Sequence, residues 1–563
     1  MGDTETNTKT NKGCPHGNMC IMGTNRHDLS RRHLLASGAT VSAAAIAGCI
    51  GGNGDDDDEG NGEPADGDSS SFEFTQELER DEDFDPIHSN DAYSVQVFKL
   101  VFDSLYTWDD GLGLEPQLAV DMPDVERDGT RYLYEIHDGV EFHNGDEVTA
   151  EDVAHSFMAY QEEESVNEAQ YDMIDSAEVI DDYQVQVDLD HPFGPWELQT
   201  MAIYVVPESE RETEADREEF NTNPVGSGPF VWSDFEHNEF VTLERNDDYW
   251  GDVPDLEEVT FVDNVDPASR ISEIRAGDTD AIADVPNDDF DELEAEDGVN
   301  VHLSESPSYM HLTFNCRDDA PTGDADVRRG ICHAFSMTDF VESRLENVAA
   351  PLSAPIPPIT NEQWDFPLDE WHEEHYPTYD PELAEELLEG AVDDDWSPRI
   401  LAPGDHRGDL AERIVTRLHE LGYDGAEAVT LEFGPLLDQT VYNEDPSPDD
   451  FQAYLLGWTG GPDPDAYLYN LYHESQVGVN QAHFYEGRGD FHDNIADARE
   501  SADFDERYDL YEDVMIEMLE ELPSLPAYSF HNTMASRDYV QNLEAHPMVQ
   551  QNPRIAHNNV TIQ

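Results

Sequence analysis

A tryptophan followed by small residues ends an apolar run late in the chain. Trp458 comes after the apolar segment 453–456 and before Thr459, Gly460 and Gly461. An aromatic ring at a strand end beside glycines is typical of a ligand cleft, because the ring offers contact area and the glycines leave the backbone open. The alternative is that the Trp458 ring packs in the core. These residues are the first candidates for ligand contact.

A second candidate is a short basic sequence after another apolar run. His406 and Arg407 stand in the segment 401–407, which has the character of a turn from a strand into a helix. Arginine can hold a carboxylate through two parallel hydrogen bonds. Because the chain has few basic residues, each arginine is a stronger candidate for ligand binding than usual. The many acidic residues nevertheless favour an intramolecular salt bridge for Arg407.

Motifs for catalysis are weak. A phosphate-binding loop needs Gly-Lys-Ser/Thr, yet the only lysine after residue 48 is Lys99, between a phenylalanine and a leucine. His372 and His375 are three residues apart, whereas a zinc-protease helix needs a spacing of four. The sequence contains 129 acids, so carboxylate pairs say nothing about acid–base catalysis. We therefore expect no enzyme, no cofactor and no dedicated metal site, and keep a cell-surface hydrolase as an alternative.

Paired arginines precede a run of small apolar residues near the start of the chain. Arg31 and Arg32 are followed by the apolar segment 34–47 and by Cys49, which completes the sequence Ile-Ala-Gly-Cys. The run is too short to cross a bilayer core of about 30 Å. The order of these features predicts a twin-arginine (Tat) export signal over 1–48, with Cys49 lipidated as the first mature residue. The alternatives are a buried Cys49 and a start at Met22.

Composition supports a high-salt setting. The chain has 129 acidic and 27 basic residues, a formal net charge of −102. At low salt this charge would oppose a compact fold, whereas in molar salt the Debye length is about 3 Å and the repulsion is screened. Disorder is not expected, because 10% of the residues are aromatic and 38% hydrophobic. The charge excludes nucleic acid as a partner and indicates halophilic adaptation of an archaeal type.

The segment after Cys49 is expected to be a tether. Residues 49–71 are mainly Gly, Asp, Asn, Ser and Pro, so they cannot bury a core and form an acidic flexible linker. The folded body is then held at the extracellular face of the cell membrane. Cys316 and Cys332 could pair or remain reduced, and Asn559 begins a possible glycosylation sequence.

Strands and helices alternate from residue 72 onward, which predicts an α/β protein. Period-two alternation or short apolar runs predict strands at 132–136, 185–189, 239–243 and 259–262. Helical periodicity with capping residues predicts helices beginning at 149 and covering 268–275, 381–391, 410–421 and 504–522.

Several stretches, in order along most of the mature chain, resemble one family. The strongest is Asp-Gly-Thr at 128–130, a strand, the turn His-Asp-Gly-Val-Glu-Phe-His-Asn-Gly-Asp at 137–146, and a capped helix from 149. Further matches are 223–230 with 243–251, 274–280, 314–315 with 326–329, and 456–458 with 463–465. Together they resemble the extracytoplasmic solute-binding proteins of family 5, the substrate-binding lipoproteins of peptide- and nickel-type ABC importers.

This resemblance implies a fold like that of type II periplasmic binding proteins, with two α/β lobes around a cleft and an inserted domain. It places lobe I at 72–110, 222–298 and 525–563, the inserted domain at 111–221, and lobe II at 299–524. The implied protein is a monomer that captures a peptide or similar solute and delivers it to membrane permease subunits, which work with cytoplasmic ATPase subunits. A metal chelate or an oligosaccharide is the alternative ligand.

The resemblance also extends the candidate site. Gly226 and Gly228 flank Ser227 where a domain crossover is expected, so the glycines are a candidate hinge, with plain turns as the alternative. Ser227, Tyr309, Asn315 and Asp463 join the ligand-contact candidates.

The tryptophan motif departs from the family pattern. In peptide-binding relatives an aspartate follows this tryptophan and pairs with the ligand's amino group, whereas here a glycine stands at the matching position. Asp463 and Asp465 are nearby acids that we expect at the surface. The sequence therefore does not identify the solute.

Overall fold

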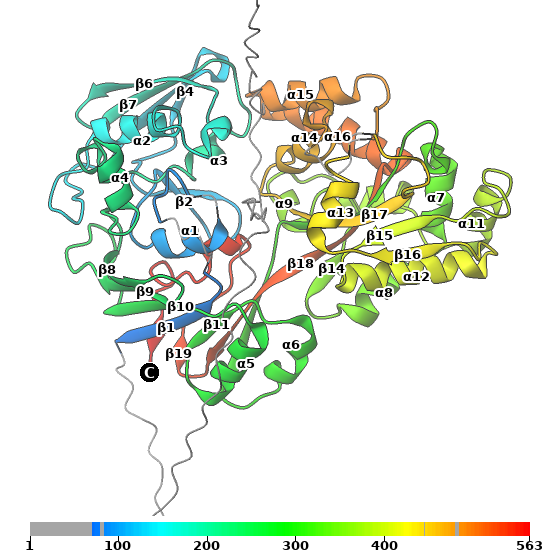
Figure 1. Ribbon diagram of the computed structural model, residues 1–563. Helices are drawn as coiled ribbons and strands as arrows, with labels where there is room; N and C mark the ends of the chain where they lie inside the picture. Colours follow the sequence, from blue (N-terminus) through cyan, green and yellow to red (C-terminus); the bar gives the residue numbers. More distant parts are fainter. Residues whose placement is uncertain (1–69, 79–83, 90, 444, 479–483) are drawn as a thin grey trace, which may run out of the picture.

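A sheet of twelve strands forms the frame of the molecule (Figure 1). The computed structural model describes residues 70–78, 84–89, 91–443, 445–478 and 484–563; the expected signal, Cys49 and nearly all of the linker lie outside these ranges. The strands of this sheet are β1 (Ser71–Gln76), β8 (Phe230–Glu236), β9 (Phe240–Arg245), β10 (Glu258–Asp263), β11 (Ala281–Ala283), β12 (Val299–Glu305), β13 (Ser308–Phe314), β14 (Ala349–Pro351), β15 (Arg399–Ala402), β16 (Glu427–Thr430), β17 (Ala453–Thr459) and β18 (Ser524–Arg537).

The long strand β18 joins two lobes, which stand apart on the left and right of Figure 1. Its first part pairs antiparallel with β13 and β14, and its second part pairs antiparallel with β12 and β11. The second connection runs from β12 to β13 through Ser306 and Pro307. Ser529 Oγ donates a hydrogen bond of 2.9 Å to Ser306 O, so the two connections touch. The lobes join here, a few residues after the expected boundaries at 299 and 525.

Lobe I contains the β1 half of the sheet and helices on its faces (Figure 1). The C-terminal segment returns to this lobe, where the Gln96 side-chain amide donates to Val549 O at 2.7 Å. The other elements of lobe I are α1 (Ala92–Phe98), β2 (Tyr106–Trp108), β3 (Leu114–Pro116), α5 (Pro267–Ala276), α6 (Asn287–Glu294), β19 (Val540–Gln541), η6 (Val549–Gln551) and β20 (Thr561–Ile562).

The inserted domain is built on a separate four-stranded antiparallel sheet in the order β4-β5-β7-β6. Helix α2 packs on this sheet, and buried residues of the domain share one core with lobe I. The elements of the domain are β4 (Asp124–Glu126), η1 (Arg127–Gly129), β5 (Arg131–Glu135), α2 (Ala150–Glu162), η2 (Glu168–Gln170), β6 (Ile174–Asp181), β7 (Gln184–Leu189), α3 (Trp196–Thr200), η3 (Glu208–Glu210) and α4 (Glu214–Phe220).

Lobe II covers its part of the sheet with helices on both faces, as α/β folds require. Leu312 and Leu455 pack in the core under α7, α8, α11 and α12, whereas Tyr309 packs in the core under α14, α15 and α16. The helices are α7 (Ala325–His333), α8 (Met337–Arg344), α9 (Pro358–Asn361), α10 (Leu368–Glu374), α11 (Pro381–Leu388), α12 (His406–Glu420), α13 (Phe433–Gln439), α14 (Asp465–Tyr472), α15 (Phe491–Glu500) and α16 (Phe504–Glu521), with the short turns η4 (Pro321–Gly323) and η5 (Glu474–Gln476).

The elements expected from the sequence are confirmed with shifts of a few residues at their ends. The strands are β5, β7, β9 and β10, and the helices are α2, α5, α11, α12 and α16. The Asp152 carboxylate accepts from Thr149 N at 2.9 Å, which fixes the start of α2. Gly277 ends α5 in the left-handed region at φ 77°.

Three local features of the described residues bear on the sequence analysis. Cys316 and Cys332 are both free thiols in this structure, and burial raises the pKa of Cys316 to about 11. The Asn559 side chain is engaged with Asp255, accepting from its N–H at 2.9 Å. Among the described residues, no helix combines the length and apolar character needed to span a bilayer.

Candidate functional site

The carboxyl ends of three parallel strands of lobe II meet at the edge where the lobes join. Strands β15, β16 and β17 run parallel, while β13 runs antiparallel to both β17 and β18. The chain therefore leaves β15, β16 and β17 on the same side on which β18 crosses to lobe I. In open α/β sheets, ligands bind outside the carboxyl ends of the strands. We call this edge the strand-end site; it comprises residues 308–310, 405–407, 457–461 and 528–530.

Trp458 lies in this site and is positioned by the core. It is the register partner of Tyr309 in the β13–β17 pair. The indole N–H donates to Ala466 O at 2.8 Å, and the ring packs against the core under α14 to α16 while remaining partly exposed. The two roles weighed from the sequence are thus combined: one part of the ring is packed and another part is available at the edge.

Arg407 forms the salt bridge that its acidic surroundings suggested. Asp405 caps α12 by accepting from Arg407 N at 2.9 Å, and its carboxylate also accepts from Arg407 Nε at 3.0 and 3.1 Å. Burial alone would raise the pKa of Asp405, but the hydrogen bonds and charge of Arg407 hold it below its usual value. A Cβ atom at Gly457 would lie 3.8 Å from Arg407 Nη1, which places this nitrogen beside the end of β17.

His406 connects the start of α12 to the crossing strand. Its ring contacts the rings of Phe530 and Tyr528, with centroid distances of 4.6 and 5.8 Å. Burial lowers the pKa of His406 to about 4, so the ring is neutral near pH 7. The His406 ring therefore packs, uncharged, on the strand that joins the lobes.

The loop after Trp458 is clamped from several sides. Gly461 O accepts from Thr360 Oγ1 at 2.8 Å, and Pro462 O accepts from Trp364 Nε1 at 3.0 Å. A side chain at Gly460 would overlap the Tyr467 ring. The loop is therefore a rigid wall of the site.

Asp463 and Asp465 are buried, so the expectation that they lie at the surface is wrong. Both oxygens of Asp463 accept from Arg507 Nη2, at 2.7 and 2.8 Å. Asp465 pairs with Arg499 at 2.5 Å, and burial raises the pKa of Asp465 to about 6. In this structure Asp463 faces Arg507 and not the strand-end site.

Ser227 and its two glycines lie in lobe I, away from the junction. Ser227 Oγ donates to the buried carboxylate of Asp103 at 3.0 Å. A Cβ at Gly228 would lie 2.7 Å from Leu100 O, and one at Gly226 would overlap Val101 O. These glycines permit close packing of two backbone segments. The lobes are joined instead by β18 and by the β12–β13 connection, so the two glycines do not lie where a hinge between the lobes is needed.

Two more candidates have core positions. Asn315 follows the other end of β13, is fully buried, and donates to Phe451 O at 3.3 Å. The Tyr309 side chain is also fully buried, with its hydroxyl 3.3 Å from that of Tyr472. Only its backbone belongs to the edge. The structure thus brings together Trp458, Thr459, Gly460, Gly461, His406 and Arg407, but not Ser227 or Asn315.

Three residues of the site were not found from the sequence. Met310 contacts the end of β17, where its side chain occupies the space that a Cβ at Gly457 would need. Tyr528 and Phe530 lie on β18 against His406. All three are large hydrophobic residues within strands, so nothing in their type or spacing separates them from core residues.

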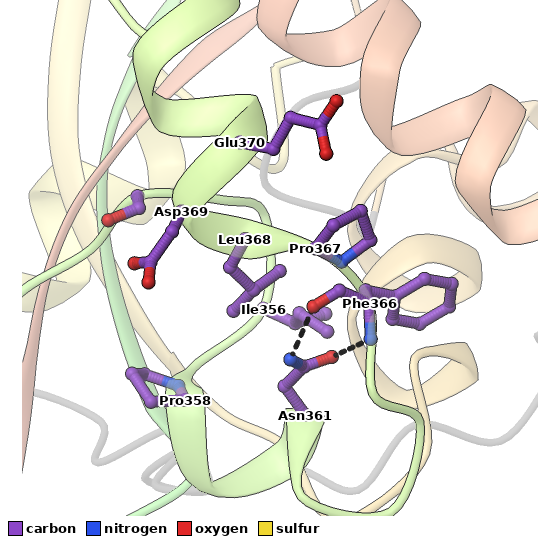
Figure 2. A pocket seen from close by; sticks show the side chains of 9 residues that line it. Ile356, Pro358, Asn361, Phe366, Pro367, Leu368, Asp369 and Glu370 are labelled. Carbon is purple, nitrogen blue, oxygen red and sulfur yellow. Dashed lines mark hydrogen bonds between the residues drawn. The ribbon is translucent and has the colours of Figure 1, made fainter.

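A shallow pocket of about 460 Å³ lies beside the site on lobe II (Figure 2). Figure 2 shows Ile356 and Leu368 in its middle, with the Asn361 side chain bridging to the Phe366 backbone. The carboxylates of Asp369 and Glu370 complete its lining. Thr360 and Trp364, which clamp the loop after Trp458, come from the same segment.

One cluster among the described residues has three potential metal ligands: Asp85, His88 and Glu163. Arg211 Nη1 lies 2.7 Å from Asp85 Oδ2, and Arg211 Nη2 lies 2.5 Å from Glu163 Oε2. The guanidinium group binds both carboxylates and offsets one of their two negative charges. The cluster is an ion-pair network between lobe I and the inserted domain, far from the strand-end site in the chain and in the fold.

The family model described as "Bacterial extracellular solute-binding proteins, family 5 Middle" matches residues 113–478 of the chain. A similar curated protein is the oligopeptide-binding protein AppA of Bacillus subtilis, 24% identical over 489 residues, which cover 82% of this chain and 87% of AppA.

Solved structures share the fold. The periplasmic binding protein DppA of Helicobacter pylori in complex with the peptide STSA has a TM-score of 0.68 at 22% identity, covering 87% of this chain and 98% of DppA. NikZ of Campylobacter jejuni in complex with Ni(L-His) has a TM-score of 0.69 at 20% identity, covering 88% of this chain and 99% of NikZ. The two-lobed α/β fold of type II periplasmic binding proteins, expected from the motifs, is confirmed.

Proposed function

Because the chain belongs to family 5 of the bacterial extracellular solute-binding proteins, we propose that it binds a peptide or peptide-like solute at the strand-end site for an ABC importer. The relatives are substrate-binding proteins, and the chain is a binding protein rather than an enzyme. The observation that supports this site most is the convergence of Trp458, Arg407 and a clamped glycine loop at the carboxyl ends of parallel strands, where the lobes join.

The chemistry of the site favours a ligand with a carboxylate and backbone amides. Asp405 takes hydrogen bonds from Nε and Nη2 of Arg407. Nη1 and the second N–H of Nη2 form the other edge of the guanidinium group, which can hold a ligand carboxylate through two hydrogen bonds. Asp463, the acid nearest in sequence to Trp458, is paired with Arg507, so it does not offer a free carboxylate for an amino group. Peptides are the first class to test, because AppA is named as an oligopeptide-binding protein and DppA was solved with a peptide.

A metal chelate is the second candidate, since NikZ was solved with Ni(L-His). The three-ligand cluster among the described residues is occupied by Arg211. A chelate would therefore be held by its organic part, through the same arginine and aromatic ring.

The remaining steps of the function follow from the N-terminal segment. Export by the Tat route, lipidation of Cys49 and a charged tether would place the body at the extracellular face of the membrane. A monomer with its solute bound between the lobes would then dock on permease subunits. Replacing Cys49 by serine should release the protein into the medium.

The test is thermal unfolding of the mature chain in molar KCl against a panel of solutes. The panel holds short peptides, N-acetylated peptides, peptide amides, oligosaccharides and nickel chelates. A true ligand at a hundred times its dissociation constant adds about 2.7 kcal/mol to the free energy of unfolding. We expect peptides with a free carboxylate to stabilise the protein, with or without a free amino group.

Arg407→Gln tests the site within the same assay. Losing a charged hydrogen-bond donor should cost about 1.5–3 kcal/mol of binding free energy, which is about 10- to 150-fold in affinity. Arg413→Gln is the matched control, because Arg413 lies on the same helix and packs over Phe340 of α8, at 5.6 Å. Equal effects of the two substitutions, or no stabilisation by any member of the panel, would contradict the proposal.

A further inference from the structure

The inserted domain touches lobe II where α15 ends and α16 begins (Figure 1). Gly194 N donates to Arg499 O at 2.7 Å. The Arg499 guanidinium group lies over the Phe193 ring, 4.8 Å from its centroid. We call this contact the corner contact; it comprises Gly129, Phe193 and Gly194 of the inserted domain and 499–502 with Arg507 of lobe II.

The fit at this corner depends on two glycines. A Cβ atom at Gly194 would overlap the Arg507 guanidinium group and lie 2.7 Å from Ser501 O. A Cβ atom at Gly129 would overlap the Ala502 side chain. The three nearest atoms to the Gly194 position all belong to lobe II, so a methyl group there is excluded by contact with the other lobe and not by the inserted domain itself.

On the lobe II side, both arginines are fixed by buried carboxylates. Arg507 is bound to Asp463 and donates from Nε to Ala498 O at 3.0 Å. Arg499 is bound to Asp465 and also lies over the Tyr469 ring. Basic residues are scarce in this chain, with 27 against 129 acidic residues. Two arginines nevertheless lie at the corner contact, where their ion pairs hold them in fixed positions.

The same carboxylates connect this corner to the strand-end site. Asp463 and Asp465 follow Gly461 and Pro462 closely, and the 460–462 loop is clamped by Thr360 and Trp364. A displacement of the loop that follows Trp458 would therefore shift the carboxylates that orient Arg499 and Arg507. The 460–462 loop and the lobe II side of the corner contact are therefore parts of one rigid unit, because the start of α14 links them.

We propose that the corner contact is a latch that holds the two lobes together. The latch raises the affinity for the solute without touching it, because closing the lobes around the solute also forms the corner contact and gains its free energy. This inference rests on the proposed function for its effect on affinity. The effect on the distance between the lobes does not depend on any ligand.

Gly194→Ala separates the latch from the site. The backbone at Gly194 is outside the left-handed region, so alanine introduces no strain in the inserted domain, and the added methyl group blocks only the approach of lobe II. Gly434→Ala is the matched control, because a Cβ at that position of α13 meets no atom within 4 Å. Ala502→Leu blocks the same corner from the exposed side of lobe II and serves as the second variant.

Small-angle scattering in molar KCl measures the radius of gyration, and titration with the solute found by the panel measures affinity. We expect a larger radius for Gly194→Ala and Ala502→Leu than for the wild type and Gly434→Ala. We also expect an affinity loss of about five- to hundredfold for the two corner variants, with unchanged circular dichroism.

The outcomes separate the two claims. The latch is overturned, while the proposed function stands, if the wild type and all variants bind the solute with equal affinity. It is also overturned if all of these proteins have the same radius of gyration, both free and with solute. If the wild type binds no member of the panel, the proposed function fails, and the radii of the free proteins alone decide whether the latch exists.

Discussion

At Asp103, one buried carboxylate accepts hydrogen bonds from four side chains. Gln117 and Tyr249 donate to Oδ1 at 2.6 and 3.0 Å, and Ser227 and Trp250 donate to Oδ2 at 3.0 and 2.9 Å. Burial raises the pKa of Asp103 to about 6, although the hydrogen bonds from Trp250, Ser227 and Tyr249 lower it in part. The motif around Ser227 and Trp250 therefore organises lobe I.

This pKa predicts a specific pH dependence. Between about pH 4 and pH 6 the native Asp103 keeps a proton that the unfolded chain has released, so this group makes stability fall as pH rises through that window. Asp103→Asn removes this contribution. The stability advantage of the wild type over the variant should shrink by about 1–3 kcal/mol from pH 4 to pH 7. Urea unfolding at each pH measures it, and a constant advantage would contradict the assigned burial.

Residue types alone predicted part of the site. Trp458, His406 and Arg407 could be found because an aromatic residue beside glycines and a basic pair at a helix start are unusual in an acidic chain. Asp463 and Asp465 could not be placed, because their burial depends on Arg499 and Arg507, which follow much later in the sequence. Pairing between distant residues leaves no local signal.

Among the elements, the loop after Trp458 has two neighbouring glycines in different surroundings. A Cβ at Gly460 would lie 2.6 Å from Tyr467 Cε1, whereas a Cβ at Gly461 meets nothing within 4 Å. Neither glycine has a positive φ. The two positions form a matched pair for testing whether the loop is clamped.

Gly460→Ala should lower the free energy of unfolding by about 1–3 kcal/mol, because the added methyl group forces the loop away from Tyr467. Gly461→Ala should change it by less than about 0.5 kcal/mol. Chemical unfolding of both variants in molar KCl measures the difference. Equal stability of the two variants would mean that the loop is not held against Tyr467.

Helices and strands with strong local signals were predicted well, whereas the exact positions at which the chain crosses between the lobes were missed by a few residues. Thr149 with Asp152, the proline at the start of α11 and Gly277 mark helix ends through local hydrogen bonds and backbone preferences. Strand β18 changes partners along its length, and its sequence mixes apolar and polar residues throughout, so it does not mark where the chain passes from one lobe to the other. The position of the junction is set by these partners.

For the whole molecule, the large negative net charge governs how stability depends on salt. Most arginines of the described residues form ion pairs, such as Arg131 with Asp188 at 2.5 Å and Arg211 with Asp85 at 2.7 Å. The remaining surface is rich in carboxylates, and its repulsion is screened over about 3 Å in 1 M salt but over about 10 Å in 0.1 M salt.

The free energy of unfolding should therefore fall as KCl is diluted from about 1 M to about 0.1 M. A nonionic osmolyte should not replace the salt fully, because it favours the compact state without screening charge. Thermal unfolding across the salt series measures this dependence. Equal or greater stability at low salt would contradict the halophilic interpretation.

The central claim is that a solute binds between the lobes at the carboxyl ends of the lobe II strands. Hydrogen exchange of the mature chain, with and without the solute found by the panel, tests it most directly. We predict slower exchange at 405–408, 457–463, 306–310 and 528–531. Protection confined to the pocket around Ile356 and Leu368, or to surfaces away from the junction, would contradict the account.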